Sequence, residues 1–248
     1  MPSFQSRTAA QMRRPWCLLA LTWMACGALV SAHADDRPFL RTTHAMASDD
    51  DDAWEVNSTM VANRRGQALG IQLEHELTPM QRLELEWGAS TQESAPEPEQ
   101  GVRLRSLWLS PETHGWGFAT KLGLEPRRDH AVGGDRWQAM GVWSLPLLQA
   151  RWWVHANVGW QWQRHNGDAP SRTQISSWAT HFVVNPDQWL YAENASASDG
   201  REGLLHVGWR QWLMHHQLAL DVGGGRLRAP AHSGEFIAVN LSFFDLNF

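Results

Sequence analysis

The stretch that decides the fold is Trp152-Trp-Val-His-Ala-Asn-Val-Gly-Trp-Gln-Trp-Gln163. Apolar residues at every even position, from Trp152 to Trp162, alternate with a mostly polar set that includes His155 and Asn157. A period of two is typical of a β-strand whose two faces meet different environments. Strands of soluble proteins average about 5–6 residues, whereas a tilted strand that crosses a membrane needs about 9–11. The length of this run therefore favours a membrane-spanning strand.

The same alternation recurs along most of the chain, and Leu83-Glu-Leu-Glu-Trp87 is one of its clearest repeats. It is weakest near 188–194 and within 101–110, where Leu107 and Leu109 interrupt it. We predict twelve strands, at residues 54–63, 67–77, 82–90, 101–110, 116–125, 136–145, 150–164, 173–184, 188–194, 203–213, 217–225 and 235–248.

The connections between these strands alternate in length. Mostly tight turns cover 78–81, 110–115, 146–149, 185–188 and 214–216, and longer polar loops cover 90–100, 126–135, 165–172, 194–202 and 226–234. Bacterial outer-membrane barrels have an even number of strands, short periplasmic turns and longer outer loops. The predicted fold class is therefore all-β: a single antiparallel transmembrane β-barrel of about twelve strands, with short periplasmic turns and longer outer loops.

The composition of the chain limits its class. With 43% hydrophobic and 19% charged residues over 248 positions, it is globular. A formal net charge of −5 excludes a broadly basic nucleic-acid-binding protein. Beyond the N-terminal segment, no stretch approaches the roughly 18 consecutive apolar residues of a transmembrane helix.

Residues 1–34 are predicted to be a cleaved signal peptide. Arg13 and Arg14 form its positive region, Trp16–Val30 its apolar core, and Ala32-His33-Ala34 its cleavage site. The apolar run is shorter than the roughly 20 residues that a spanning anchor helix needs. A lipoprotein signal ending at Cys26 is a second alternative, although bulky residues precede this cysteine.

Both cysteines, Cys17 and Cys26, lie in the signal segment, so the chain after residue 34 contains no cysteine. Residues 35–53 include the acidic run Asp49–Asp52, and we expect them to form an acidic, flexible periplasmic lead. Residues 54–248 are then the outer-membrane barrel.

The second face of the predicted strands is polar and charged. A closed barrel satisfies its backbone hydrogen bonds and has no edge, so its inner face is free to be polar. The residues predicted to line the lumen are Glu74, Glu76, Glu84, Glu86, Arg103, Arg105, Lys121, His155, His206 and Arg210. Two readings stay open: a charged wall that guides a polar or ionic solute, or an ion-pair network that fills a narrow barrel.

Tryptophan is abundant, with 16 residues against one tyrosine. Aromatic residues with a polar edge gather at membrane–water interfaces. The predicted membrane-interface aromatics are Trp54, Trp87, Trp116, Trp143, Trp152, Trp162 and Phe248. Core packing in a soluble barrel is the alternative.

The terminal strand ends on Phe248 and supports the same class. Its apolar face changes parity at Phe243-Phe244, so we expect a β-bulge there, with the set from Ile237 to Phe243 facing lipid. Through this strand the barrel-assembly machinery is an expected partner, as is outer-membrane lipid.

The sequence offers no strong catalytic or metal-binding motif. His232-Ser233 is an adjacent pair without an obvious orienting acid other than Glu235, and His215-His216 lies in a predicted turn. We predict no catalytic residue, no metal site and no cofactor, and we expect the protein not to be an enzyme.

The opening strands carry a family resemblance. Asp51-Asp-Ala-Trp-Glu-Val-Asn57, Gly70-Ile-Gln-Leu-Glu-His-Glu76 and Leu83-Glu-Leu-Glu-Trp87 resemble the start of small transporter-like outer-membrane barrels associated with phenol-degradation pathways. The resemblance implies a barrel with a solute-passage role and supplies no site residues.

We therefore expect an outer-membrane barrel of a Gram-negative bacterium that acts as a narrow channel or transporter for small polar or ionic solutes, with no nucleic-acid partner. Two alternatives stay open. One is a soluble periplasmic β-barrel binding protein, and the other is a non-conducting barrel used as a structural or adhesion scaffold.

Overall fold

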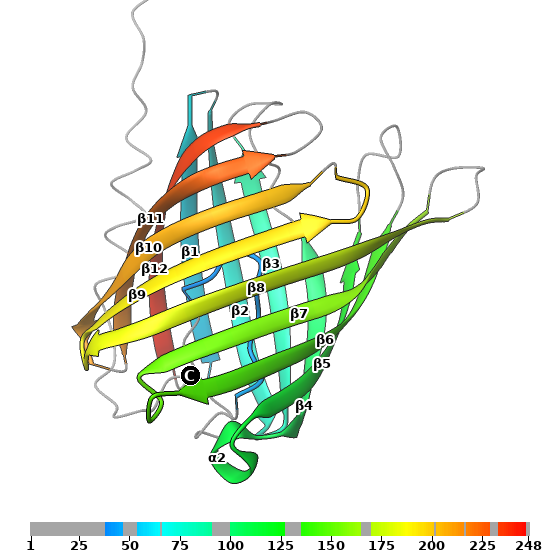
Figure 1. Ribbon diagram of the computed structural model, residues 1–248. Helices are drawn as coiled ribbons and strands as arrows, with labels where there is room; N and C mark the ends of the chain where they lie inside the picture. Colours follow the sequence, from blue (N-terminus) through cyan, green and yellow to red (C-terminus); the bar gives the residue numbers. More distant parts are fainter. Residues whose placement is uncertain are drawn as a thin grey trace, which may run out of the picture. The chain divides into compact units, whose positions relative to one another are not determined.

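The protein is a closed antiparallel barrel of twelve strands in which the first strand pairs with the last (Figure 1). The computed structural model describes residues 38–46, 54–64, 66–90, 100–126, 135–164, 170–200, 202–215, 217–228 and 233–246. These residues belong to one compact unit, and the predicted signal peptide and Phe248 lie outside them.

Every strand pairs with its neighbours in the sequence, and β1 with β12 closes the ring. The strands are β1 Trp54–Asn63, β2 Gly66–Thr78, β3 Gln81–Ser90, β4 Gly101–Leu109, β5 Gly117–Glu125, β6 Arg136–Leu147, β7 Trp152–Gln163, β8 Ser171–Asn185, β9 Gln188–Ala197, β10 Gly203–Met214, β11 Leu218–Arg228 and β12 Gly234–Leu246. The predicted fold class and strand number are confirmed.

Two connections differ from the sequence prediction. Strand β9 extends to Ala197, because its second half pairs with both β8 and β10, so the predicted loop at 194–202 is reduced to a short turn. The turn at 110–115 contains a short helix, α2 Pro111–His114, which ends at Gly115 with a φ of 75°. Among the described residues, no helix is long and apolar enough to cross a membrane.

The outer face of the barrel is apolar. Leu122 in β5, Val207 in β10 and Ile237 in β12 have exposed fractions of 56%, 54% and 62%. Their neighbours in the chain point the other way and are buried, as Lys121 and His206 show with exposed fractions of 6% and 1%. The period of two therefore separates an apolar exterior from a polar interior, the reverse of a water-soluble core.

Strand β12 shows why the apolar pattern changes parity. Val56 of β1 lies opposite Phe243, but Trp54 lies opposite Leu246, so β12 has an extra residue between these two pairs. Asp245 in this interval has a φ of 55°, which is a left-handed conformation. Phe244 continues the inward face of Phe236, Ala238 and Ser242, with an exposed fraction of 3%. The extra residue places Leu246, opposite Trp54, back in the phase of Phe243, opposite Val56.

The irregularity at Leu107 also has a structural reason. Its side chain points inward and packs in a buried cluster with Ala45, Ala119 and Val142. The register between β4 and β5 shifts directly after it. An inward apolar residue at this position therefore serves a contact with Ala45, which lies outside the strands.

Candidate functional site in the barrel interior

The interior of β1 to β3 is organised around Arg82. Its guanidinium lies 3.1 Å from a Glu55 oxygen and 2.9 Å from Glu74, and its Nε donates to Glu76. Arg82 and Glu76 face each other in the register of β2 and β3. The exposed fraction of Arg82 is 1%, so three carboxylates share one buried cation.

A second set of ion pairs continues over β3 to β6. Lys121 Nζ lies 2.6 Å from Glu84 Oε2. Arg103 pairs with Glu86, and its other nitrogen lies 3.1 Å from Glu125 Oε1. The acids and bases that segregate by strand in the sequence therefore meet across neighbouring strands. On this side, which we name the charged wall (β1–β6), the inner residues form the ion-pair network that the sequence left as one of two readings.

The opposite side of the interior, which we name the ring wall (β7–β12), is rich in aromatic side chains. The His181 ring stacks on Trp189 with centroids 4.9 Å apart, and Tyr191 meets His206 at 5.2 Å. Ring residues on this wall are Trp153, His155, His181, Trp189, Tyr191, His206, Trp212, Phe236 and Phe244.

One ion pair is embedded in the ring wall. Arg210 Nε and Nη2 donate to the two Asp221 oxygens at 2.6 and 2.8 Å, and Asn240 donates to the same carboxylate at 2.9 Å. The guanidinium carbon of Arg210 lies 5.6 Å from the Trp212 ring centroid. A planar cation held by a two-point bond and by rings suits arginine better than lysine.

His155 belongs to a buried polar cluster between the two walls. Its Nδ1 lies 2.8 Å from Ser144 Oγ, and its Nε2 lies 3.3 Å from His181 Nδ1. The second ring nitrogen thus faces another histidine and not a carboxylate, so this pair lacks the third member of a Ser-His-Asp arrangement.

Residues 38–46, which we name the inner segment, lie inside the barrel. The backbone N–H groups of Leu40 and Arg41 donate to the Glu193 carboxylate at 2.8 and 2.7 Å, and Thr42 N–H donates to the same group. Glu193 in β9 has an exposed fraction of 0%. One buried carboxylate thus binds three consecutive backbone donors.

The second half of the inner segment binds three other strands. The His44 carbonyl accepts from Arg105 Nη1 at 2.9 Å, and Ala45 N–H donates to Ser144 Oγ at 2.7 Å. With its amide oriented to satisfy both groups, Asn157 accepts from Thr43 N–H and donates to its carbonyl. The segment therefore bridges the charged wall and the ring wall.

This arrangement corrects the expectation of a flexible periplasmic lead over 35–53, as far as residues 38–46 are concerned. Those residues are held inside the barrel because Glu193, Ser144 and Arg105 supply partners for their backbone groups. The acidic run at 49–52 lies outside the described residues.

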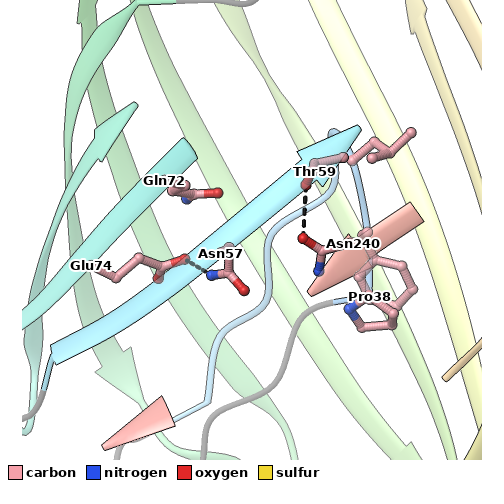
Figure 2. A pocket seen from close by; sticks show the side chains of 8 residues that line it. Pro38, Asn57, Thr59, Gln72, Glu74 and Asn240 are labelled. Carbon is pink, nitrogen blue, oxygen red and sulfur yellow. Dashed lines mark hydrogen bonds between the residues drawn. The ribbon is translucent and has the colours of Figure 1, made fainter. Parts of the chain in front are cut away.

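Cavities lie beside the inner segment, among the described residues. Figure 2 shows the smaller one, of about 30 Å³, where Thr59 Oγ1 donates to Asn240 at 2.8 Å and Asn57 donates to Glu74 at 3.3 Å. The larger cavity, of about 160 Å³, is bounded by Leu40 and Arg41 of the inner segment and by residues of β1, β2, β10 and β12. Both cavities are therefore bounded in part by the inner segment.

The sequence-predicted lining residues all lie in this interior. The predicted inner-face residues are buried, except Glu86, whose side chain has an exposed fraction of 26%. Sequence reasoning missed Arg82, Glu193 and Ser144 as central residues. The parity of β3 was a usable signal for Arg82, because positions 82, 84 and 86 share one face.

Comparison with solved structures places the fold. The barrel is similar to the NanC porin in its rhombohedral crystal form, with a TM-score of 0.60 and 7% identity over 79% of this chain and 100% of that one. It is also similar to the KdgM porin, with a TM-score of 0.58 and 8% identity over 76% and 98% of the two chains. An outer membrane channel from Pseudomonas putida F1 gives a TM-score of 0.54 and 12% identity over 80% and 97%. The fold is that of the outer-membrane porins. No protein-family model and no curated protein matches the sequence.

On this porin fold, most of the predicted interface aromatics lie on the outer face. Trp87, Trp116, Trp143 and Trp152 have exposed fractions between 40% and 50%. Trp54 is half-buried and stacks on the His75 ring with centroids 4.2 Å apart. Trp162 is half-buried near the end of β7, and Phe248 lies outside the described residues. Their role at a membrane interface stays a prediction.

Of the remaining motifs, the two described residues, Ser233 and His215, are exposed. Ser233 is exposed directly before β12, and His232 lies outside the described residues, as does His216. His215 Nδ1 lies 3.0 Å from Asp187 Oδ1 in neighbouring turns. Within the part of the porin barrel that the structure describes, no group of three His, Cys, Asp or Glu residues is arranged to hold a metal ion.

Proposed function

We propose that this protein is an outer-membrane channel for small polar or ionic solutes. The observation that carries the proposal is the division of one closed barrel into an apolar exterior and a charged, hydrogen-bonded interior. A barrel without an edge satisfies its backbone in lipid, and its polar inner wall offers a path that lipid does not.

The same division argues against the soluble binding protein. Burying apolar side chains stabilises a soluble barrel by about 25 cal/mol per Å². Here Leu122 and Ile237 are more than half exposed, while Glu84 and Arg210 have exposed fractions of 0%. Lipid around the outer face removes this unfavourable contact with water.

We place the chain in the outer membrane of a Gram-negative bacterium, with its short turns in the periplasm and its inner-face charges along the solute path. The porin fold and the resemblance of the first three strands to transporter-like barrels associated with phenol-degradation pathways support a role in solute passage. The KdgM porin also has a structure in complex with disordered oligogalacturonate.

Conductance in planar bilayers tests the proposal. The double variant Glu74→Gln/Glu84→Gln removes two buried carboxylates from the charged wall and leaves the positive charges of Arg82 and Lys121. We expect the ratio of cation to anion permeability, measured as the reversal potential in a salt gradient, to fall.

Glu235→Gln is the matched control, because Glu235 is an exposed carboxylate at the start of β12. Its reversal potential should equal that of the wild type. The channel proposal fails if neither the wild type nor a variant with residues 38–46 replaced by a Gly/Ser sequence conducts. Recovery of the protein in the aqueous periplasmic fraction without detergent would favour the soluble barrel.

A further inference from the structure

We propose that the inner segment is an autoinhibitory plug, latched by Glu193, whose withdrawal opens the channel. This proposal rests on the channel function proposed above. It assigns to residues 38–46 a control of the open state, and to Glu193 the role of a positioning residue that holds them.

The inner segment is bound by side chains and not by strand pairing. The described strands pair only with one another, and the ring is closed by β1 and β12 without the inner segment. Its backbone groups hydrogen-bond to the side chains of Glu193, Ser144, Asn157 and Arg105. Removing the segment therefore leaves the hydrogen-bond ladder of the barrel complete.

The surface beneath the segment is suited to water as well as to peptide. Glu193, Ser144 and Asn157 have polar groups that water satisfies, so withdrawal exchanges protein hydrogen bonds for hydration. The apolar contacts also come from side chains: Ala45 packs on Leu107, and Leu40 packs against the cluster of Leu204, Phe236 and Ala238. The Phe39 ring lies 5.5 to 6.1 Å from the ring centroids of His155, His181 and Tyr191. A segment held in this way is displaceable, unlike a strand.

The wall is also shaped to let the segment approach closely. A Cβ atom at Gly117, the first residue of β5, would lie 1.9 Å from the Ala45 carbonyl oxygen. Only glycine leaves room for the backbone of the segment here. The same Cβ would lie 2.9 Å from Pro111 Cγ of α2, so Gly117 makes room for both the inner segment and the preceding turn, with the closer approach on the side of the segment.

Glu193 accepts hydrogen bonds from three consecutive backbone N–H groups of the segment. Hydrogen bonds to a charged acceptor are roughly twice as strong as those to a neutral one. Glu193→Gln keeps the size of the side chain and one acceptor oxygen, but it removes the charge that the N–H groups of Leu40, Arg41 and Thr42 share. We expect the ratio of open to closed channels to rise roughly tenfold.

The first experiment compares single-channel recordings of wild type, Glu193→Gln and the control Glu235→Gln, with heat-modifiable migration in gels showing that each barrel is folded. We expect rare openings in the wild type and the control, and frequent openings of the same unit conductance in Glu193→Gln. An unchanged open fraction in a folded Glu193→Gln barrel overturns the latch.

A second experiment locks the segment in place. The variant Ala45→Cys/Ser144→Cys introduces two thiols where the Ala45 nitrogen now lies 2.7 Å from Ser144 Oγ. Mass spectrometry identifies the cross-link in the full chain, and the same bilayer is recorded before and after a reductant. We expect no channel openings while the segment is cross-linked and channel openings after reduction.

The outcomes separate the two proposals. If the cross-linked protein conducts as well as the reduced one, the inner segment is not a plug, but the channel function stands. If the Gly/Ser replacement of residues 38–46 conducts no better than the wild type while both conduct, the plug is again refuted. If no form conducts, the channel function itself fails, and the plug proposal fails with it.

Discussion

Arg82 is the residue whose loss should damage the barrel most. Its guanidinium pairs with Glu55, Glu74 and Glu76, and its exposed fraction is 1%. Replacing it with methionine keeps most of the volume but leaves three carboxylates without their shared cation. Breaking a buried ion pair by removing one partner costs about 3–5 kcal/mol, so we expect Arg82→Met to lower the free energy of unfolding by about this amount.

Arg103→Met provides a graded comparison. Arg103 contacts Glu86 and Glu125, but the Glu86 side chain has an exposed fraction of 26% and is more accessible to water. We expect a smaller loss, about 1.5–3 kcal/mol, as for hydrogen bonds to charged groups. Arg64→Met, at an exposed turn residue, is the control and should stay within about 0.5 kcal/mol of wild type.

The assay is equilibrium unfolding by urea of the protein inserted in lipid vesicles. Coincident unfolding and refolding curves show that equilibrium is reached. A second-site test separates charge from packing: adding Glu74→Gln and Glu76→Gln to Arg82→Met should recover part of the loss, because fewer carboxylates stay uncompensated. A loss below about 1 kcal/mol for Arg82→Met, or no recovery in the triple variant, would refute the ion-pair account.

Two further substitutions test the inner segment and the lipid face. Gly117→Ala should displace the inner segment, because the new Cβ would lie 1.9 Å from the Ala45 oxygen, and bilayer recordings should show more openings. Gly70→Ala, with its nearest neighbouring atom 3.9 Å from the added Cβ, should leave the recordings unchanged, and equal behaviour of the two variants would contradict the reasoning. Leu122→Arg, on the outer face of β5, should lower the free energy of unfolding in vesicles by about 2–4 kcal/mol. Leu148→Arg, in the turn after β6 with an exposed fraction of 66%, should change the free energy of unfolding little. Equal losses of unfolding free energy in the two variants would indicate that Leu122 does not face lipid.

The strands were predictable because their information is local. In β7 the alternation of Trp152 to Gln163 indicates both a strand and its two faces, and the tight turn before it makes β6 its antiparallel neighbour. The end of β9 was missed because Asn194 to Ala197 carry little apolar contrast, and only pairing with β8 and β10 on both sides holds them in the sheet.

The site was predictable only in part. Parity alone places Glu84 and Lys121 on the inner face, but it does not state that they pair. The inner segment has no period, and its partners lie far along the chain: Glu193 is 153 residues from Leu40, and Ser144 is 99 residues from Ala45. Contacts of this kind form only in the closed barrel, so no local sequence pattern predicts them.

The two unlike walls of the interior have a consequence for anything that passes between them. The charged wall runs over β1 to β6, and the ring wall faces it across the bore from β7 to β12. A solute between the walls would contact charged side chains on one side and aromatic ring faces on the other. Rotation of the solute would break both sets of contacts at the same time. For the proposed channel we therefore expect selection by the arrangement of polar groups on the solute as well as by its diameter, in favour of a molecule with its polar groups on one side and its C–H surface on the other.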